Sequence, residues 1–427
     1  MEKDNRVLEI IQYIKLKYDL TQYEVQNWEV ISNITCNRET VYILHMQWVD
    51  TSLLINGNDI NNSDHALFIE VDLASKQLKN VVNRGSQLHS NKLKFDLAHK
   101  DDIIKWIEEE TGLAYKKQFV LFNEKENELY FKGCINDIPV SPTSHIKIKI
   151  NEVGALALFS VVGHFPYKDE VKEDQYHFSI YHIDKAIMYE QLKLINFPDT
   201  QLKEFVPYYA IEEIYIKTDC TSTLNYEYFT FSKPRMLINQ MLVWDAVEVA
   251  SPFQRQALNT SSHIYTLEQA FKREPHPDLQ PISSTQVRKC MLAIESFLSH
   301  LYPHDSGKWL INGLNRESGY IQALLKQKED ESNIVQRKML IYLDSSTLEV
   351  LNFIDNIQMV SMYDGYSKSG KINVTKHSAF QKLSDVMVLE PAYVYDDELG
   401  YYVLCGKLDC QYAVNAYNGK IKALNEL

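Results

Sequence analysis

The chain has 427 residues, 45% hydrophobic and 24% charged, a composition typical of folded proteins and, at this length, of about two to four compact domains. Its formal net charge of -13 opposes binding to nucleic acids and to anionic lipids, because both carry negative charge. Its 27 tyrosines and 17 phenylalanines favour strands, so we expect an α+β fold rich in sheet.

The first segment, "MEKDNRVLEIIQYIKLKYDL", has charged residues within each apolar run, whereas a signal peptide has a continuous apolar core. The sequence also has no window of about 18 apolar residues that could span a membrane. We therefore expect a cytoplasmic protein whose six cysteines are reduced thiols. A bridge between Cys405 and Cys410 is the alternative.

A hairpin with a polar turn residue recurs along the chain. The first copy is "HALFIEVDLASKQLKNVV" at 65–82, and the last is "QYAVNAYNGKIKALNEL" at 411–427. The aligned turn residues are Asp72, Asn151, Asp245, Asp344 and Asn415. Their spacing of about 70 to 100 residues indicates repeated units. Asp or Asn at such a place bonds its own backbone two positions on, so we interpret these residues as turn formers and not as catalytic groups.

A helix is predicted upstream of each hairpin, where it can cover the apolar face of a small sheet. The clearest, "STQVRKCMLAIESFLSHLY", has Ser284 as its expected N-cap and ends before Pro303. The five predicted helices span 7–18, 101–112, 183–195, 284–302 and 376–388. With one further strand between helix and hairpin, the predicted unit is one helix packed on a roughly three-stranded antiparallel sheet.

These patterns divide the chain into five units and one linker. The stretch "FKREPHPDLQPISS" carries three prolines and predicts the main domain boundary. The predicted segments are a divergent unit at 1–96, units at 97–170 and 175–274, a Pro-rich linker at 275–282, a unit at 283–360 and a carboxyl-terminal unit at 375–427.

This unit resembles the PepSY domain. The segment "YVLCGKLDCQYAVNAYNGKIKAL" comes closest, with Asn415-Ala416 where the family has Asp-Ala and Asn418-Gly419 at its turn. The middle of the chain, "LYFKGCINDIPVSPTSHIKIKINEVGALALFSVVGHFP", is similar to the YcdB/YcdC repeat family, with Ile138-Pro139-Val140 as the step between strands and Gly154 in the turn. The resemblance implies a bacterial protein of tandem PepSY-like units that binds or restrains a peptidase. It supplies no catalytic, cofactor-binding or metal-ligating residue.

Searches for common catalytic and metal motifs gave no candidate. His300 and His304 have the spacing of a zinc site on a helix, but Pro303 breaks the helix between them. The 14 glycines form no phosphate-binding loop. The adjacent acids Glu212-Glu213 and Asp396-Asp397 point to opposite faces of a strand or lie in turns, so we predict solvated structural roles for them. We predict no catalytic, cofactor-binding or metal-binding residue.

The sequence thus predicts a non-catalytic protein-interaction protein whose partner is another protein, with a peptidase as the partner that the resemblance implies. Exposed strand edges in such units permit partner binding by strand addition. The alternative is an enzyme or small-molecule binder whose site is assembled between units. A scaffolding role is a third reading.

Overall fold

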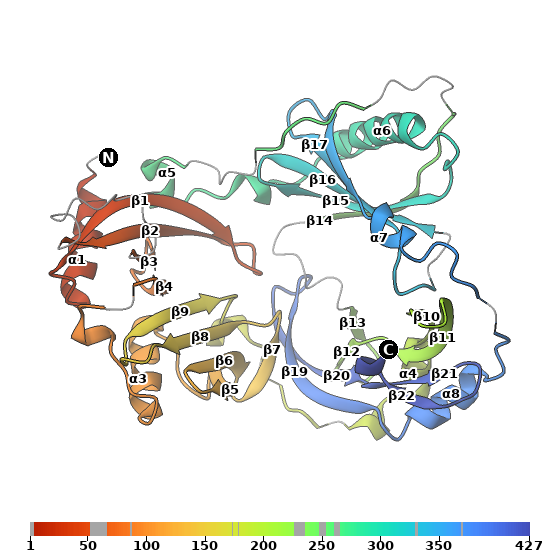
Figure 1. The fold of residues 1–427 in the computed structure, drawn as a ribbon, viewed down its shortest axis with the longest axis horizontal. Coiled ribbons are helices and arrows are strands. Elements are labelled where there is room, and N and C mark those ends of the chain that lie inside the picture. Colours follow the sequence, from red (N-terminus) through yellow and green to blue (C-terminus); the bar gives the residue numbers. More distant parts are fainter. Residues whose placement is uncertain are drawn as a thin grey trace. The chain divides into compact units, whose positions relative to one another are not determined.

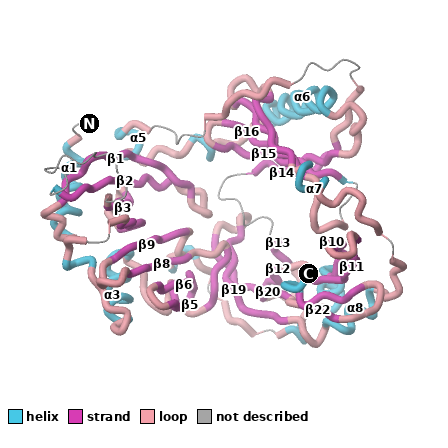
Figure 2. Tube along the Cα trace, viewed as in Figure 1, coloured by secondary structure: helices cyan, strands magenta, loops and turns pink. Residues whose placement is uncertain are grey.

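The computed structural model describes residues 4–51, 66–85, 88–172, 174–177, 179–225, 235–246, 253–259, 265–328, 332–368 and 370–427. The chain forms two compact units, each built from three segments (Figure 1). Unit 1 comprises Met1–Asp174, Ser262–His276 and Ala392–Val403, and unit 2 comprises Gln175–Ser261, Pro277–Pro391 and Leu404–Leu427. Figure 2 shows that strands make up much of both units.

Unit 1 is a long curved sheet with helices on one face (Figure 1). Its helices are α1 (Asn5–Lys17), α3 (Lys100–Thr111) and α5 (Leu267–Phe271), with 3-10 turns η2 (Asn91–Leu93) and η3 (Lys168–Glu170). Its strands are β1 (Tyr23–Ile34), β2 (Thr40–Asp50), β3 (Leu67–Asp72), β4 (Leu78–Asn83), β5 (Phe119–Lys125), β6 (Glu128–Ile135), β7 (Ile138–Ser141), β8 (His145–Ile150) and β9 (Leu156–Val162). Hydrogen bonds join them in the order β1-β2-β3-β4-β9-β8-β6-β7, and β5 pairs with β6.

The core of unit 1 lies between this sheet and helices α1 and α3. Alternate residues of β2 point inward, so Leu44, Met46 and Trp48 have no exposed surface. They share one cluster with Val7 of α1 and Ile103 of α3, which are also fully buried. The apolar face of the strands, which repeats every two residues, therefore packs against the apolar faces of the helices, which repeat every 3.6 residues, in one core.

Unit 2 contains two further sheets. Its helices are α4 (Lys185–Gln191), α6 (Ser284–Leu301), α7 (Ile357–Ser361) and α8 (Lys376–Leu383), with 3-10 turns η4 (Ile180–His182), η6 (Pro277–Leu279) and η8 (Leu424–Glu426). One sheet has the order β14 (Arg235–Met241), β15 (Trp309–Glu317), β16 (Tyr320–Gln327), β17 (Lys338–Asp344) and β18 (Val350–Asp355). The other has the order β10 (Leu192–Asp199), β11 (Glu204–Ile211), β21 (Tyr412–Asn415) and β22 (Ile421–Ala423).

Helix α6 lies where the sequence pattern predicts a helix, but its N-cap is Ser283 and not the expected Ser284. Ser283 caps it by accepting a hydrogen bond from the main-chain N–H of Gln286 at 3.3 Å. Ile294 and Leu298 are fully buried against the five-stranded sheet, in one cluster with Trp309. The apolar stripe of the helix therefore forms one side of the core of this sheet.

The carboxyl-terminal hairpin β21–β22 does not stand alone. Its strand β21 pairs with β11, with Val414 opposite Tyr209. Helix α8 packs on the hairpin, because Phe380 and Leu383 share a buried cluster with Val414. The expectation that the helix predicted at 376–388 covers this hairpin is confirmed, although α8 ends at Leu383.

Four of the five predicted turn residues bond their own backbone as expected. Asp72, Asn151, Asp344 and Asn415 each accept hydrogen bonds from main-chain N–H groups two or more positions on, at 2.7 to 3.2 Å. The turn that follows Asp245 extends beyond the described residues.

The sequence pattern missed further turns of the same kind, among them those at Asp199 and Asp396. Asp199 accepts from Gln201 and Leu202, and Asp396 accepts from two residues of its own turn. Asp396 was expected to have a solvated structural role, but only 2% of it is exposed. Four positions after each of these two aspartates the backbone has positive φ, 54° at Lys203 and 78° at Gly400.

The expected fold class of tandem units, each with one helix on about three strands, is wrong. Strand β4, in the segment 1–96, pairs with β9, in the segment 97–170. Strand β7 pairs in parallel with β19 (Val388–Asp396) from the carboxyl-terminal segment. The strand order continues through β19 and β20 (Tyr401–Asp409) to β12 (Ile214–Lys217) and β13 (Thr223–Asn225), a mixed sheet of 13 strands. The physical reason is that small sheets leave unpaired N–H and C=O groups at their edges, and here those edges pair with each other. The predicted unit boundaries themselves stay a prediction.

None of the helices in the described ranges has the length and apolar character needed to cross a bilayer. None of the six cysteines, all of which lie in described ranges, takes part in a disulfide.

Candidate functional site

The turn between β1 and β2 holds Cys36 and Asn37 in fixed positions. The main-chain N–H of Thr35 donates to the carbonyl of Glu39 at 2.9 Å, and Glu39 donates back to the Thr35 hydroxyl at 3.0 Å. The Thr35 hydroxyl donates to Oδ1 of Asn37, and the Nδ2 amide of Asn37 donates to Glu170. Arg38 completes the turn with φ of 62°.

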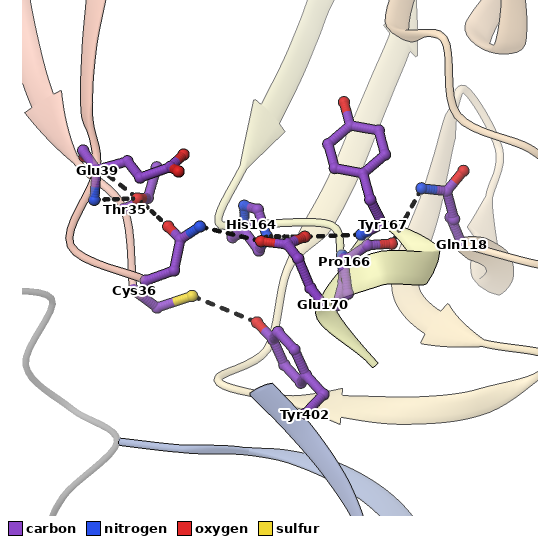
Figure 3. A network of polar contacts seen from close by, with 10 residues as sticks. Thr35, Cys36, Glu39, Gln118, His164, Pro166, Tyr167, Glu170 and Tyr402 are labelled. Atoms are coloured by element: carbon purple, nitrogen blue, oxygen red, sulfur yellow. Dashed lines mark hydrogen bonds and ion pairs between the residues drawn. The ribbon is translucent and has the colours of Figure 1, made fainter. Parts of the chain in front are cut away.

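Glu170 is the centre of a polar network in unit 1 (Figure 3). Its carboxylate accepts hydrogen bonds from Nδ2 of Asn37 at 3.0 Å and from the main-chain N–H of Tyr167 at 2.7 Å. Nε2 of His164 lies 2.8 and 2.9 Å from its two oxygens. Burial alone would raise the pKa of Glu170, but these hydrogen bonds outweigh it, His164 foremost, and hold the pKa below its ordinary value. The carboxylate is therefore ionised and fully engaged.

A second contact joins this turn to strand β20. The Cys36 thiol lies 3.3 Å from the hydroxyl of Tyr402, which has no exposed surface (Figure 3). Burial raises the pKa of the Cys36 thiol, and the hydrogen bond with Tyr402 offsets only part of that rise. Burial also raises the pKa of Tyr402. The thiol is therefore protonated at neutral pH, whereas a reactive cysteine needs a thiolate.

The chain enters this network from β9 by a sharp change of direction. Gly163 has φ of 83°, and a Cβ there would lie 2.9 Å from the Cα of Ser144. Only glycine fits this close approach, and it lets residues 163–167 leave the sheet. Phe165, which follows, is 6% exposed and anchors the segment in the core.

Beside the network lies a pocket of about 600 Å³ within unit 1. It is lined by the β1–β2 turn and the first residues of β2, the β3–β4 turn, the end of α3, residues 161–167 and the end of α5. Charged side chains of both signs line it, namely Glu39, Asp72, Lys79 and Arg273. Since the lining also contains buried apolar residues, the pocket offers contacts to both polar and apolar groups.

The α5 wall of the pocket is pinned to the rest of unit 1. The Tyr42 hydroxyl donates to the carbonyl of Glu274 at 2.8 Å, and the main-chain N–H of His276 donates to the Thr40 hydroxyl at 2.7 Å. Arg6 pairs with Glu268 at 2.8 Å. These contacts connect segments more than 200 residues apart and hold this side of the pocket in place.

The side chains weighed at the sequence level lie elsewhere. His300, in the last turn of α6, donates from Nδ1 to the carbonyl of Ser296 at 2.7 Å, and His304 lies beyond the end of that helix. Glu213 pairs with Lys407 at 2.7 Å. Asp397 lies 3.3 Å from Arg38, so this acid belongs to the neighbourhood of the β1–β2 turn. Within the part of the chain that the structure describes, no three His, Cys, Asp or Glu side chains gather as a metal site would require.

Sequence reasoning missed the Glu170 network and the pocket. Their residues come from segments as far apart as Cys36 and Tyr402, which are separated by 366 positions. One local signal existed, because "GHFPYKDE" at 163–170 places His, Tyr and acids together in a loop with Gly and Pro.

No family model matches the chain, and no curated protein matches it. Among solved structures, the C-terminal domain of YpeB from Bacillus megaterium is similar at a TM-score of 0.25 and 10% sequence identity, with 83% of this chain and 98% of that chain covered. Similarity at this TM-score carries no argument about fold or function.

Proposed function

We propose that this chain is a non-catalytic protein-binding protein and that the pocket of unit 1 receives part of its partner. The observation that carries the proposal is the pocket itself, about 600 Å³ with polar and apolar lining and with walls held by hydrogen bonds. Fixed walls favour binding, because little conformational entropy is lost when the partner docks.

The groups beside the pocket support binding over catalysis. Glu170 already accepts hydrogen bonds from three residues, so it has little capacity left to act as a general base. The raised pKa of Cys36 keeps its thiol protonated. The resemblance of the sequence to PepSY domains adds the finer proposal that the partner is a peptidase or another bacterial protein.

Small-molecule binding is the second candidate. The pocket volume falls in the range of about 300–1,000 Å³ that is usual for small-ligand sites. The lining also comes from widely separated parts of the sequence, as expected for a site assembled from several segments.

A pair of matched variants tests the proposal. Ala74 is exposed, lines the pocket and bonds Asp72 only through its main-chain N–H, so Ala74→Trp fills the pocket while keeping the turn. Ser346 occupies the same position of the Asp344 turn, is exposed and lies outside the pocket lining. Ser346→Trp is therefore the control for adding an exposed indole to such a turn.

The full-length protein and both variants are immobilised and exposed to cell lysate, captured proteins are identified by mass spectrometry, and binding of the purified partner is titrated. We expect the wild type and Ser346→Trp to bind equally and Ala74→Trp to bind at least about tenfold more weakly, a loss of about 1.4 kcal/mol. A peptidase partner should lose activity in the presence of the wild type. Equal binding by all three proteins would exclude the pocket as the site.

A thermal-shift screen with small metabolites separates the second candidate. Suppose that a metabolite stabilises the wild type and Ser346→Trp but not Ala74→Trp, and that no protein partner depends on the pocket. The pocket would then be a small-molecule site and not a protein-binding site.

A further inference from the structure

Helix α6 has a second apolar stripe beside the one that enters the core. Cys290, Ile294 and Leu298 are fully buried against the five-stranded sheet, on which the helix lies (Figure 1). Met291 and Leu292 lie on the adjoining face of the helix, because each residue turns the helix by about 100°. Leu292 is 60% exposed. The helix therefore carries apolar side chains that its own core does not cover.

This second stripe forms one wall of a groove of about 350 Å³ in unit 2. From α6 the groove receives Val287, Met291 and Leu292. From β14 it receives Gln240 and Met236, of which 42% is exposed. Among the described strands β14 pairs with β15 only, so it is an edge of its sheet. The groove thus lies at the border of the sheet, where another molecule has access to it.

Two charged residues of opposite sign, Arg288 and Glu295, also line the groove. They are seven positions apart, or about two helical turns, so they lie on the same face of α6 above and below its apolar centre. No residue of opposite charge stands three or four positions from either one along the helix. Neither residue can therefore form the usual ion pair within its own helix.

The order of these side chains matches a second copy of the same helix. Arg288, Met291, Leu292 and Glu295 are placed symmetrically about a point between Met291 and Leu292. When two copies of α6 lie antiparallel around a twofold axis at this point, Arg288 of each copy faces Glu295 of the other. Met291 then faces Leu292. Because a twofold axis makes every contact twice, the pairing yields two opposite-charge contacts around an apolar centre.

We propose that this face of α6 is the interface of a homodimer, in which two α6 helices pack antiparallel and each Leu292 enters the groove of the other copy. The proposal goes beyond the proposed function, because it concerns a surface of unit 2 and not the pocket of unit 1. Charge complementarity selects a second copy of this chain as the occupant, since the same face carries both members of each ion pair.

The shape of β14 favours packing through the helices over strand pairing. The ladder of β14 with β15 shifts between Leu237 and Gln240, and Asn239 has φ of 49°. A bulge of this kind twists an edge strand away from a regular ladder and opposes the addition of another strand. The contact is therefore a small one between side chains, and the net charge of -13 adds repulsion between copies. We expect a dissociation constant of about 1 to 100 µM.

Sedimentation equilibrium of the full-length protein over a range of concentrations tests the dimer. The mass of the wild type should rise from 49.8 kDa towards twice that value. Leu292→Glu places a charge at the apolar centre and should weaken association at least about tenfold. Since Leu292 is mostly exposed, this variant should keep the fold of the chain, which circular dichroism verifies.

Charge reversal tests the pairing itself. Arg288→Glu and Glu295→Arg each create two like-charge contacts and should each weaken association at least about tenfold, whereas the double variant should associate as the wild type does. A mixture of the two single variants should form heterodimers, because each acid of one copy then faces a base of the other. Lys289→Glu is the matched control, since Lys289 is exposed on the same helix and lies outside the groove lining.

Three results would overturn the inference. The first is a wild type that stays at 49.8 kDa at concentrations up to about 1 mM. The second is a dimer that Leu292→Glu and both single charge reversals leave intact, because another surface would then hold it together. The third is a loss in Lys289→Glu as large as that in Arg288→Glu, or no association in the double variant and in the mixture, because net charge and not the pairing would then govern association.

Discussion

Hairpins β3–β4 and β17–β18 are built on the same turn and differ in what surrounds it. In both, an aspartate, Asp72 or Asp344, accepts main-chain N–H groups two and three positions on, at 2.7 to 2.9 Å. In both, the residue four positions on has positive φ, 60° at Lys76 and 62° at Leu348. Yet Lys76 is exposed beside the pocket of unit 1, whereas Leu348 is 8% exposed in the core of unit 2. The turn thus depends on the backbone and the aspartate alone, and its surroundings decide whether it lies in a core or beside a pocket.

The largest expected change in stability comes from replacing Leu348, four positions after Asp344, with glycine. Leu348→Gly relieves the positive φ, but it removes a buried side chain, and the net loss in the free energy of unfolding should be about 2 kcal/mol. Guanidinium unfolding, with hydrogen exchange of the β17 and β18 amides to assign the effect to unit 2, measures it. A gain in stability would show that Leu348 contributes nothing to the core.

Removing the turn carboxylate should have a similar effect in both hairpins. Asp72→Ala and Asp344→Ala each leave two main-chain N–H groups without their acceptor, at a cost of about 1 kcal/mol. The matched controls are Asp72→Asn and Asp344→Asn, which keep an acceptor oxygen. Asn415 performs this role in the native chain, so the Asn variants should lose much less. If Ala and Asn variants unfold alike, the side-chain hydrogen bonds do not stabilise the turn.

Low pH should remove part of the stabilisation that the Asp344 carboxylate gives to the folded state. The N–H groups of Thr347 and Ser346 hold the pKa of Asp344 below its ordinary value. Such a group stabilises the fold above its unfolded pKa of about 3.9, and the contribution disappears as pH falls through the lower folded pKa. The stability difference between wild type and Asp344→Asn should therefore shrink on acidification below about pH 4. A difference that stays constant from pH 7 to pH 2 contradicts the assigned cause.

The smallest effect is expected at Lys76, and it has the opposite sign to that at Leu348. Lys76→Gly relieves the positive φ at an exposed site and should stabilise unit 1 by up to about 1 kcal/mol relative to Lys76→Ala. The Ala variant is the proper reference, because both variants remove the Nζ group, which lies 5.5 Å from the ring centre of Tyr13. Urea unfolding of the two variants decides whether the shared turn carries the same backbone cost in both units.

The sequence could predict these turns because their cause is local. An Asp or Asn that bonds its own backbone between two alternating strands leaves its mark within a few residues, as at Asp72 and Asn415. Helix α6 was predictable for the same reason, since its apolar stripe lies in one continuous segment, although its cap is Ser283, one residue before the expected Ser284.

What the sequence could not predict depends on contacts between distant segments. Nothing in the pattern of β4 indicates that its edge pairs with β9, some 80 positions further on, so the predicted small sheets were left with open edges. The Glu170 network and the pocket have the same origin, because each combines residues from several strands and loops. Periodicity reports which face of a strand is buried, but it does not report the neighbour at its edge.

The parallel pairing of β7 with β19 can form only late in the synthesis of the chain. Strand β7 is complete at Ser141, but its partner residues Tyr393 and Val394 are translated only after roughly 250 further residues, which takes roughly 12 to 50 s at about 5–20 residues per second. Tyr402, which meets Cys36, emerges later still. Throughout that interval the edge of β7 that pairs with β19 in the folded protein has no partner strand.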